Sequence, residues 1–140
     1  MLKVAPTPYE ITGCWLFIKP RGTGHPLHSH QNKYLSGVFC VQTPESADSI
    51  SFHETRTERQ INVPRYEEDS QLTSATVHVP VKSGVLIMFP SWLQHTVREN
   101  PMEETRVSLA FNVMFSNFIK AQSTPSWDWA AAEEADRAGD

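Results

Sequence analysis

The sequence predicts an all-β domain with a short C-terminal helix. Ten prolines and six glycines divide the 140 residues into short segments. These segments are rich in Val, Ile, Phe, Thr and Trp, the residue types that favour strands. A chain of this length can bury a core without disulfide bonds, so we expect residues 1–140 to form a single domain.

We expect eight strands, separated by turn segments such as "KPRGTG" at 19–24 and "VKSG" at 81–84. The strands are predicted at 9–19, 27–30, 36–42, 49–53, 73–80, 84–89, 94–98 and 105–115. Eight short antiparallel strands are typical of a jelly roll, the cupin-like double-stranded β-helix, in which two sheets face each other across a ligand-sized interior. The polar segment 54–70 is predicted to be a long loop over the mouth of this barrel.

The last sixteen residues, "PSWDWAAAEEADRAGD", predict the helix. Ser126 is a suitable N-cap, and Asp128 places an acidic side chain near the start. A frayed, solvated tail is the alternative interpretation of the same residues.

Composition excludes several classes of function. The net charge is −4 and Lys and Arg form no block, which argues against a nucleic-acid partner. The longest apolar stretches, 84–89 and 107–111, have the length of strands and are too short to span a membrane. No basic segment followed by an apolar one begins the sequence, so we expect a cytoplasmic location. Cys14 and Cys40 lie in apolar runs without metal-ligand spacing, which predicts two buried free thiols.

Three histidines occur within six residues in "HPLHSH". On a strand, His28 and His30 would lie on the same face, with their Cα atoms about 6.6 Å apart. Two neutral imidazoles placed in this way can converge on one metal ion. The alternative is a pair of hydrogen-bonded histidines in a loop. His25 falls off this face, and we expect a supporting or rim position for it. His95 follows a buried strand and a Pro-Ser-Trp turn much later in the chain.

Arg106 and Ser108 alternate with apolar residues and therefore share one face of the last strand. An arginine that points into a barrel requires an anion, because a buried unpaired guanidinium is costly. A dicarboxylate would supply this partner through bidentate hydrogen bonds. The alternative is an outward-facing Arg106 paired with Glu103 or Glu104.

The order His-x-His, a distant His and then Arg-x-Ser resembles the motif of Fe(II)- and 2-oxoglutarate-dependent dioxygenases. The segments "HSHQNKYLSGVFCVQTP", "ISFHETR" and "GVLIMFPSWLQHTVRENPMEETRVSLAFN" are similar to one family of 2-oxoglutarate and iron oxygenases, which is common in phage and marine bacteria. The resemblance covers roughly residues 13–114, most of the chain.

The resemblance implies that His28 and His95 bind Fe(II), with Arg106 on the distal carboxylate of 2-oxoglutarate and Ser108 assisting. His30 stands where the general motif has Asp or Glu, and we expect it to be the third ligand. Glu54, or two histidines and water, are the alternatives. From the residues themselves, we expect Tyr34 and Asn112 to line the pocket and contribute to co-substrate binding; purely structural roles are the alternative.

The resemblance further implies a dioxygenase that oxidises, and in particular hydroxylates, a small-molecule or peptide substrate with release of succinate and CO2. A three-histidine cupin-type dioxygenase that does not use 2-oxoglutarate is one alternative, and a non-catalytic metal-binding module is another. The chain begins close to the predicted barrel, so we expect residues 54–70 or a partner subunit to cover the site. A homodimer is one way to supply that cover.

Overall fold

The computed structural model describes residues 6–44, 49–56, 61, 64–68, 70, 71 and 73–121. These residues form eight strands followed by one short helix. The elements are β1 (Tyr9–Lys19), β2 (His25–His28), β3 (Leu35–Gln42), β4 (Ser49–His53), β5 (Thr76–Pro80), β6 (Leu86–Pro90), β7 (His95–Val97), β8 (Arg106–Phe115) and α2 (Ser116–Ala121).

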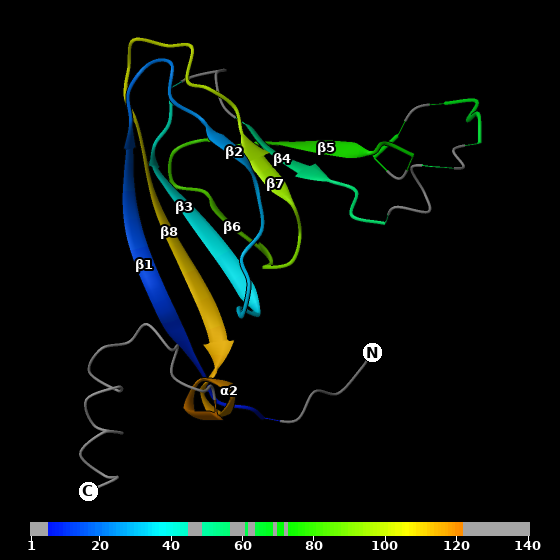
Figure 1. Ribbon diagram of the computed structural model, residues 1–140. Helices are drawn as coiled ribbons and strands as arrows, with labels where there is room; N and C mark the ends of the chain where they lie inside the picture. The colour runs from blue at the N-terminus through cyan, green and yellow to red at the C-terminus, as the bar shows by residue number, and fades with distance from the viewer. Residues whose placement is uncertain are drawn as a thin grey trace, which may run out of the picture.

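The strands build two four-stranded sheets with antiparallel neighbours (Figure 1). The larger sheet has the order β1-β8-β3-β6 and the smaller has the order β2-β7-β4-β5. Strands consecutive in sequence alternate between sheets for most of the chain, which is the connectivity of a double-stranded β-helix. The predicted jelly-roll fold is confirmed.

Pairing of β1 with β8 positions one wall of the interior. The register runs from Tyr9 opposite Phe115 to Lys19 opposite Arg106, with an irregularity between Ile11 and Gly13. Side chains alternate between the two faces of a strand, so Lys19 and Arg106 lie on one face together. Both residues line the interior cavity described below.

The centre of the larger sheet depends on a glycine in β3. Gly37 lies opposite Phe111 of β8. A Cβ at position 37 would overlap the ring of Phe111. Only glycine leaves this space for the aromatic ring, because protein interiors have no spare volume for an added methyl group.

Six of the eight strands have bounds that differ from the predicted ones, and β2, β5 and β6 differ by two or three residues. β2 ends at His28, because the amide of His30 does not continue the pairing with β7. It donates instead to the carbonyl of Ser91, 2.8 Å away. β5 begins at Thr76, because the amides of Thr73 and Ser74 close a turn on the carbonyl of Ser70. β6 begins at Leu86, after a turn in which a glycine has a φ of 83°.

The cysteine prediction was half right. Neither cysteine is in a disulfide, and Cys40 is buried, but Cys14 is exposed. Cys14 alternates with the cavity-lining Trp15 of β1, so it points to the outer face of the larger sheet.

Helix α2 follows β8 directly, whereas the helix predicted over 125–140 lies outside the described residues. The described part of the segment 54–70 extends away from both sheets (Figure 1). It therefore gives no support to the predicted loop over the barrel mouth. Within the part of the chain that the structure describes, no helix is both long and apolar enough to cross a membrane.

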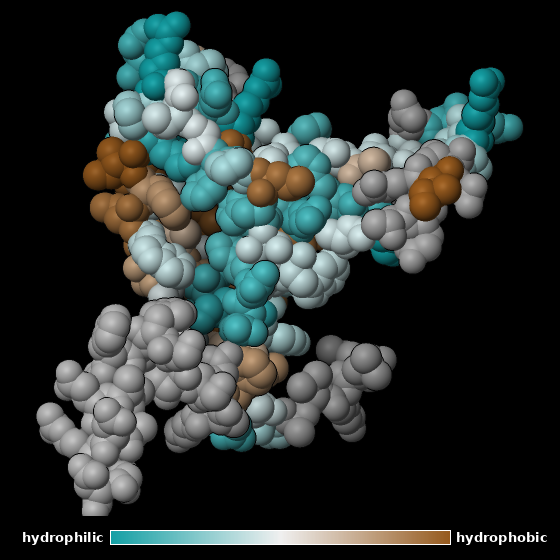
Figure 2. All heavy atoms as spheres, viewed as in Figure 1, coloured by the Kyte–Doolittle hydropathy of each residue, from teal (hydrophilic) through white to brown (hydrophobic). Residues whose placement is uncertain are grey.

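The outer face of the larger sheet is apolar. Its exposed side chains include Leu16 and Ile18 of β1, Phe39 of β3, and Leu86 and Met88 of β6. Figure 2 shows apolar side chains gathered over the β1 side of the molecule. An apolar patch of this extent is typical of a contact surface. The homodimer expected from the sequence stays a prediction.

Candidate metal centre and co-substrate cavity

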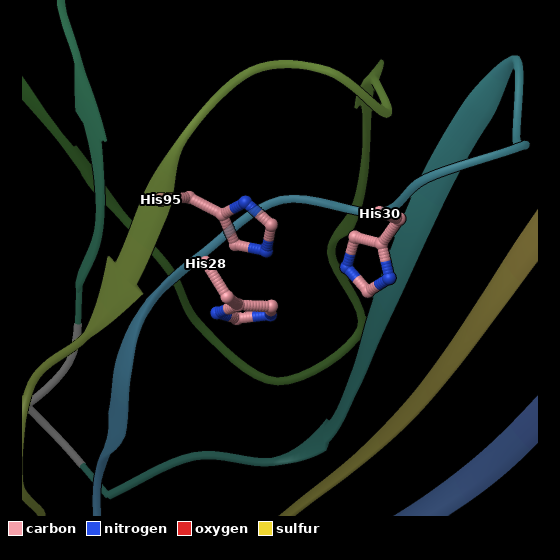
Figure 3. A group of neighbouring side chains, drawn as sticks. All are labelled: His28, His30 and His95. Carbon is pink, nitrogen blue, oxygen red and sulfur yellow. The ribbon is translucent and has the colours of Figure 1, made fainter.

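His28, His30 and His95 converge on one point (Figure 3). Their candidate ligand atoms all lie within 4.8 Å of one another. The ring centroid of His28 lies 4.1 Å from that of His95 and 5.1 Å from that of His30. Pairing of β2 with β7 sets His28 opposite His95, and the loop after β2 returns His30 toward them. The predicted convergence of His28 and His30 therefore occurs, although only His28 belongs to the strand.

Backbone carbonyls fix two of these rings. Nδ1 of His28 lies 2.8 Å from the carbonyl oxygen of Pro26, and Nδ1 of His95 lies 2.9 Å from that of Leu93. A carbonyl oxygen only accepts, so Nδ1 carries the proton in both rings. Nε2 is then left with a lone pair in each, which is the arrangement of histidines that bind metals.

A polar network adjoins the third ring. Nδ1 of His30 lies 3.4 Å from Nδ2 of Asn112. Asn112 Oδ1 accepts a hydrogen bond from Ser36 Oγ at 2.7 Å, and Ser36 Oγ lies 2.9 Å from Ser91 Oγ. An asparagine amide can be turned by 180° in the same space. In that orientation its oxygen would accept the Nδ1 proton of His30, which would give all three histidines the same tautomer.

Burial favours the neutral form of two of these histidines, His95 and His30. It lowers the pKa of His95 to about 4, with help from His28 and His30 and against the opposing effect of the Leu93 carbonyl. Burial also lowers the pKa of His30, and His28 adds to that effect. Neutral imidazole is the form that binds a metal, so near pH 7 no proton has to leave either ring before a metal binds.

His25 supports the centre without joining it. Its ring stacks on that of His28 at a centroid distance of 4.5 Å. Its Nδ1 lies 3.1 Å from Nζ of Lys19, and an ammonium can only donate, so Nδ1 accepts that bond. Burial, followed by the charge of Lys19, lowers the pKa of His25 to about 4. The supporting position expected for His25 agrees with this geometry.

Glu54 lies outside the group. Its carboxylate accepts hydrogen bonds from the guanidinium of Arg56 at 2.6 and 2.8 Å. It lines a separate surface depression beyond β4. Among the described residues, only His28, His30 and His95 form a group of metal-ligating side chains, so the alternative ligand Glu54 has no support.

A cavity of about 250 Å³ lies between the two sheets and contains the three histidines. Arg106, Ser108 and Asn112 line the same cavity. Arg106 is only 4% exposed and therefore points inward, so the alternative of an outward-facing arginine is wrong. Glu103 instead forms an ion pair with Arg21.

Tyr34 is placed differently from the prediction. It is half exposed, packs on the ring of Phe115 at a centroid distance of 4.5 Å, and lies outside the cavity lining. Its position gives no support to a part in co-substrate binding.

Three polar residues near the centre were not predicted from the sequence. Lys19 lines the cavity and is 8% exposed, while Ser36 and Ser91 are buried beside Asn112. The signal for Lys19 was its place on the same strand face as Trp15. A lysine before a proline at a strand end is otherwise typical of an exposed turn.

A family model described as "Putative 2OG-Fe(II) oxygenase" matches residues 13–112. The chain belongs to this family. Its cofactor and co-substrate are accordingly Fe(II) and 2-oxoglutarate. The residues present fit both groups, because three imidazoles suit Fe(II) and a buried Arg beside a Ser suits a carboxylate.

Several solved structures share the fold. An oxidoreductase of the 2OG-Fe(II) oxygenase family from Burkholderia pseudomallei superposes with a TM-score of 0.60 at 13% identity, covering 78% of this chain and 46% of that one. The α-ketoglutarate-dependent epimerase SnoN from nogalamycin biosynthesis gives a TM-score of 0.58 at 13% identity, with coverages of 79% and 50%. HygX from Streptomyces hygroscopicus, solved with nickel and 2-oxoglutarate bound, gives a TM-score of 0.54 at 14% identity, covering 79% of this chain and 59% of that one.

The chain thus spans about half the length of the first two of these structures. Identities this low establish the common fold alone. No curated protein matches the sequence.

Proposed function

We propose that this chain is a 2-oxoglutarate- and Fe(II)-dependent dioxygenase in which His28, His30 and His95 hold the metal. Arg106, assisted by Ser108, binds the distal carboxylate of 2-oxoglutarate. The observation that carries the proposal is the occurrence of the three histidines and the buried Arg106 in one cavity. When bound, iron and 2-oxoglutarate supply the oxidation of a substrate C–H bond by O2, with release of succinate and CO2.

The protein's first task is to hold its ligands in place. The carbonyls of Pro26 and Leu93 orient His28 and His95 before any metal arrives, which reduces the entropy cost of binding. Three protein ligands leave coordination positions open for small molecules, as a catalytic site requires. A set of neutral ligands leaves the full charge of the metal, which favours an anionic chelating co-substrate.

The second task is to hold the co-substrate at its other end. Arg106 offers a planar fork of donors to a carboxylate, and Ser108 adds a hydroxyl two residues along the same strand face. Apolar side chains such as Phe17 and Phe89 line the cavity around these groups. They limit water in the cavity, which strengthens the electrostatic contacts inside it.

We further propose a small-molecule or peptide substrate and hydroxylation as the reaction. The cavity is small, at about 250 Å³, and 2-oxoglutarate would occupy part of it. A substrate would therefore reach the centre through the open side, where Trp15 is half exposed and lines the cavity.

One observation favours a second candidate. The ligand group contains no carboxylate, as in a three-histidine dioxygenase that oxidises a chelating substrate directly. The two functions differ in the dependence of oxygen uptake on 2-oxoglutarate, which only the first requires.

The experiment that tests the proposal compares Arg106→Ala with Arg98→Ala. Arg98 is exposed and lies outside the cavity lining, so it serves as the matched control. We expect Arg106→Ala to weaken 2-oxoglutarate binding by roughly 10- to 100-fold, because it removes charge-assisted hydrogen bonds, while iron content stays at the wild-type level. Equal 2-oxoglutarate affinities in the two variants would contradict the assignment.

A further inference from the structure

The turn between β6 and β7 contacts two of the three histidines. It runs from Pro90 to Leu93, and a backbone hydrogen bond of 3.0 Å between these two residues closes it. The carbonyl of Leu93 orients the ring of His95. The carbonyl of Ser91 accepts a hydrogen bond of 2.8 Å from the amide of His30. The Pro-Ser-Trp turn therefore touches the metal centre in two places.

Ser91 holds both ends of the loop that carries His30. Its carbonyl binds the amide of His30, and its own amide donates to the carbonyl of Tyr34 at 3.1 Å. His30 lies beyond the end of β2 (Figure 3), so the pairing of β2 with β7 does not fix it. Loop residues are in general less restrained than strand residues. The two backbone bonds of Ser91 supply the restraint that the sheet does not.

The side chain of Ser91 begins a hydrogen-bonded chain that ends at the ring of His30. Ser91 Oγ lies 2.9 Å from Ser36 Oγ, which in turn lies 2.7 Å from Oδ1 of Asn112. Nδ2 of Asn112 lies 3.4 Å from Nδ1 of His30. Ser91, Ser36 and Asn112 are 0%, 2% and 3% exposed. Water cannot replace a lost partner at such depth, so each link of the chain is costly to break.

We propose that Ser91 and Ser36 are positioning residues for the third metal ligand. This inference rests on the proposed function of the three histidines. Ser91 holds the backbone of His30 directly and its ring through Ser36 and Asn112. The place and the rotation of the imidazole are thus set before a metal binds. A neutral imidazole attracts a cation less than a carboxylate does, so the affinity for Fe(II) depends more strongly on this orientation.

A purely structural role is the alternative, because buried hydrogen bonds also stabilise the packing of the sheets. The two roles differ in what a substitution changes. A structural role lowers the free energy of unfolding and leaves the affinity of the folded protein for Fe(II) unchanged. In a positioning chain the affinity falls, and the links act in series. Breaking a second link then adds no further loss, whereas independent effects add.

The test measures Fe(II) affinity by anaerobic titration of the metal-free full chain, at a temperature where every variant is folded. We expect Ser36→Ala to weaken Fe(II) binding about 10-fold and Ser91→Ala about 3- to 10-fold. The double variant should bind Fe(II) as Ser36→Ala does. Ser51→Ala is the control and should keep wild-type affinity, because Ser51 is buried and bonded to His78 outside the cavity lining.

Two results would overturn the inference alone: wild-type affinity for Fe(II) in either serine variant, or losses that add in the double variant. If Ser91→Ala does not fold, Ser91→Cys takes its place, because a thiol fills the site but is only a weak hydrogen-bond partner. Failure of the wild-type chain to bind Fe(II) would instead overturn the proposed function, and this inference with it.

Discussion

Each histidine of the centre has a polar group at Nδ1. Two of these groups are backbone carbonyls, which no substitution can remove. The third is the side chain of Asn112, which is 3% exposed and is held by Ser36. Asn112 is therefore the one of these three Nδ1 contacts that a side-chain substitution can test directly.

We expect Asn112→Ala to weaken Fe(II) binding by about 10- to 100-fold, the usual cost of losing such a supporting contact. Ser51→Ala is the control, because Ser51 is also buried and hydrogen-bonded to a histidine, His78, outside the cavity lining. Anaerobic Fe(II) titration measures both variants. Equal iron affinity in the two would show that Asn112 does not position His30.

The same histidines make the metal-free protein sensitive to acid. The folded chain lowers the pKa of His25 and His95 from 6.5 to about 4, and that of His30 in the same direction. Between pH 6.5 and about pH 4, the unfolded chain therefore binds more protons than the folded chain. The contribution of these histidines to the free energy of unfolding is full above about pH 6.5 and is lost as the pH falls toward 4. Urea unfolding of the metal-free protein at several pH values measures this. A midpoint that stays constant from pH 7 to pH 4.5 would contradict it.

Residue spacing predicted which residues form the site better than it predicted where each residue lies in the fold. His28, His30, His95, Arg106 and Ser108 all line one cavity, as alternation and the motif order indicate. The spacing could not show that His30 leaves the strand, since that depends on a hydrogen bond to Ser91, 61 positions away. Lys19 was missed for a different reason: a lysine before a proline at a strand end is typical of an exposed turn, whereas here it lies opposite Arg106 and lines the cavity.

At the level of elements, period-2 alternation and turn residues predicted the strands. The bounds of β1 and β4 agree with the prediction, and β1 ends at the predicted turn segment 19–24. The start of β5 was missed because Thr73 and Ser74, residue types compatible with a strand, close a turn on Ser70 instead. Propensity does not reveal such a competition between local hydrogen bonds.

The packing of the Phe111 ring against Gly37, where β3 pairs with β8, can be tested by mutation. We expect Gly37→Ala to lower the free energy of unfolding by about 1–3 kcal/mol, because the added methyl group overlaps the ring of Phe111. Gly22→Asn is the control: Gly22 has a φ of 78° and open space around it, and asparagine tolerates that conformation. Urea unfolding measures both. Equal stability of Gly37→Ala and wild type would show that the sheet relaxes around Phe111.

On the scale of the whole molecule, the two sheets bring distant parts of the sequence to one cavity. The smaller sheet and the loop after β2 contribute the histidines, and the larger sheet contributes Arg106, Ser108 and Lys19. A metal at one wall and an anion anchor at the other suit a ligand that chelates through one end and carries a charge at the other. Such a ligand would bind both walls of the cavity at once.

The measurement that tests it most directly is an anaerobic titration of the metal-free protein with Fe(II) and then with 2-oxoglutarate, followed by visible absorption. We expect the weak charge-transfer band of a chelated 2-oxo acid to appear only after both additions and to saturate at one 2-oxoglutarate per chain. Iron binding without that band would contradict this mode of 2-oxoglutarate binding and favour a three-histidine site that does not use 2-oxoglutarate.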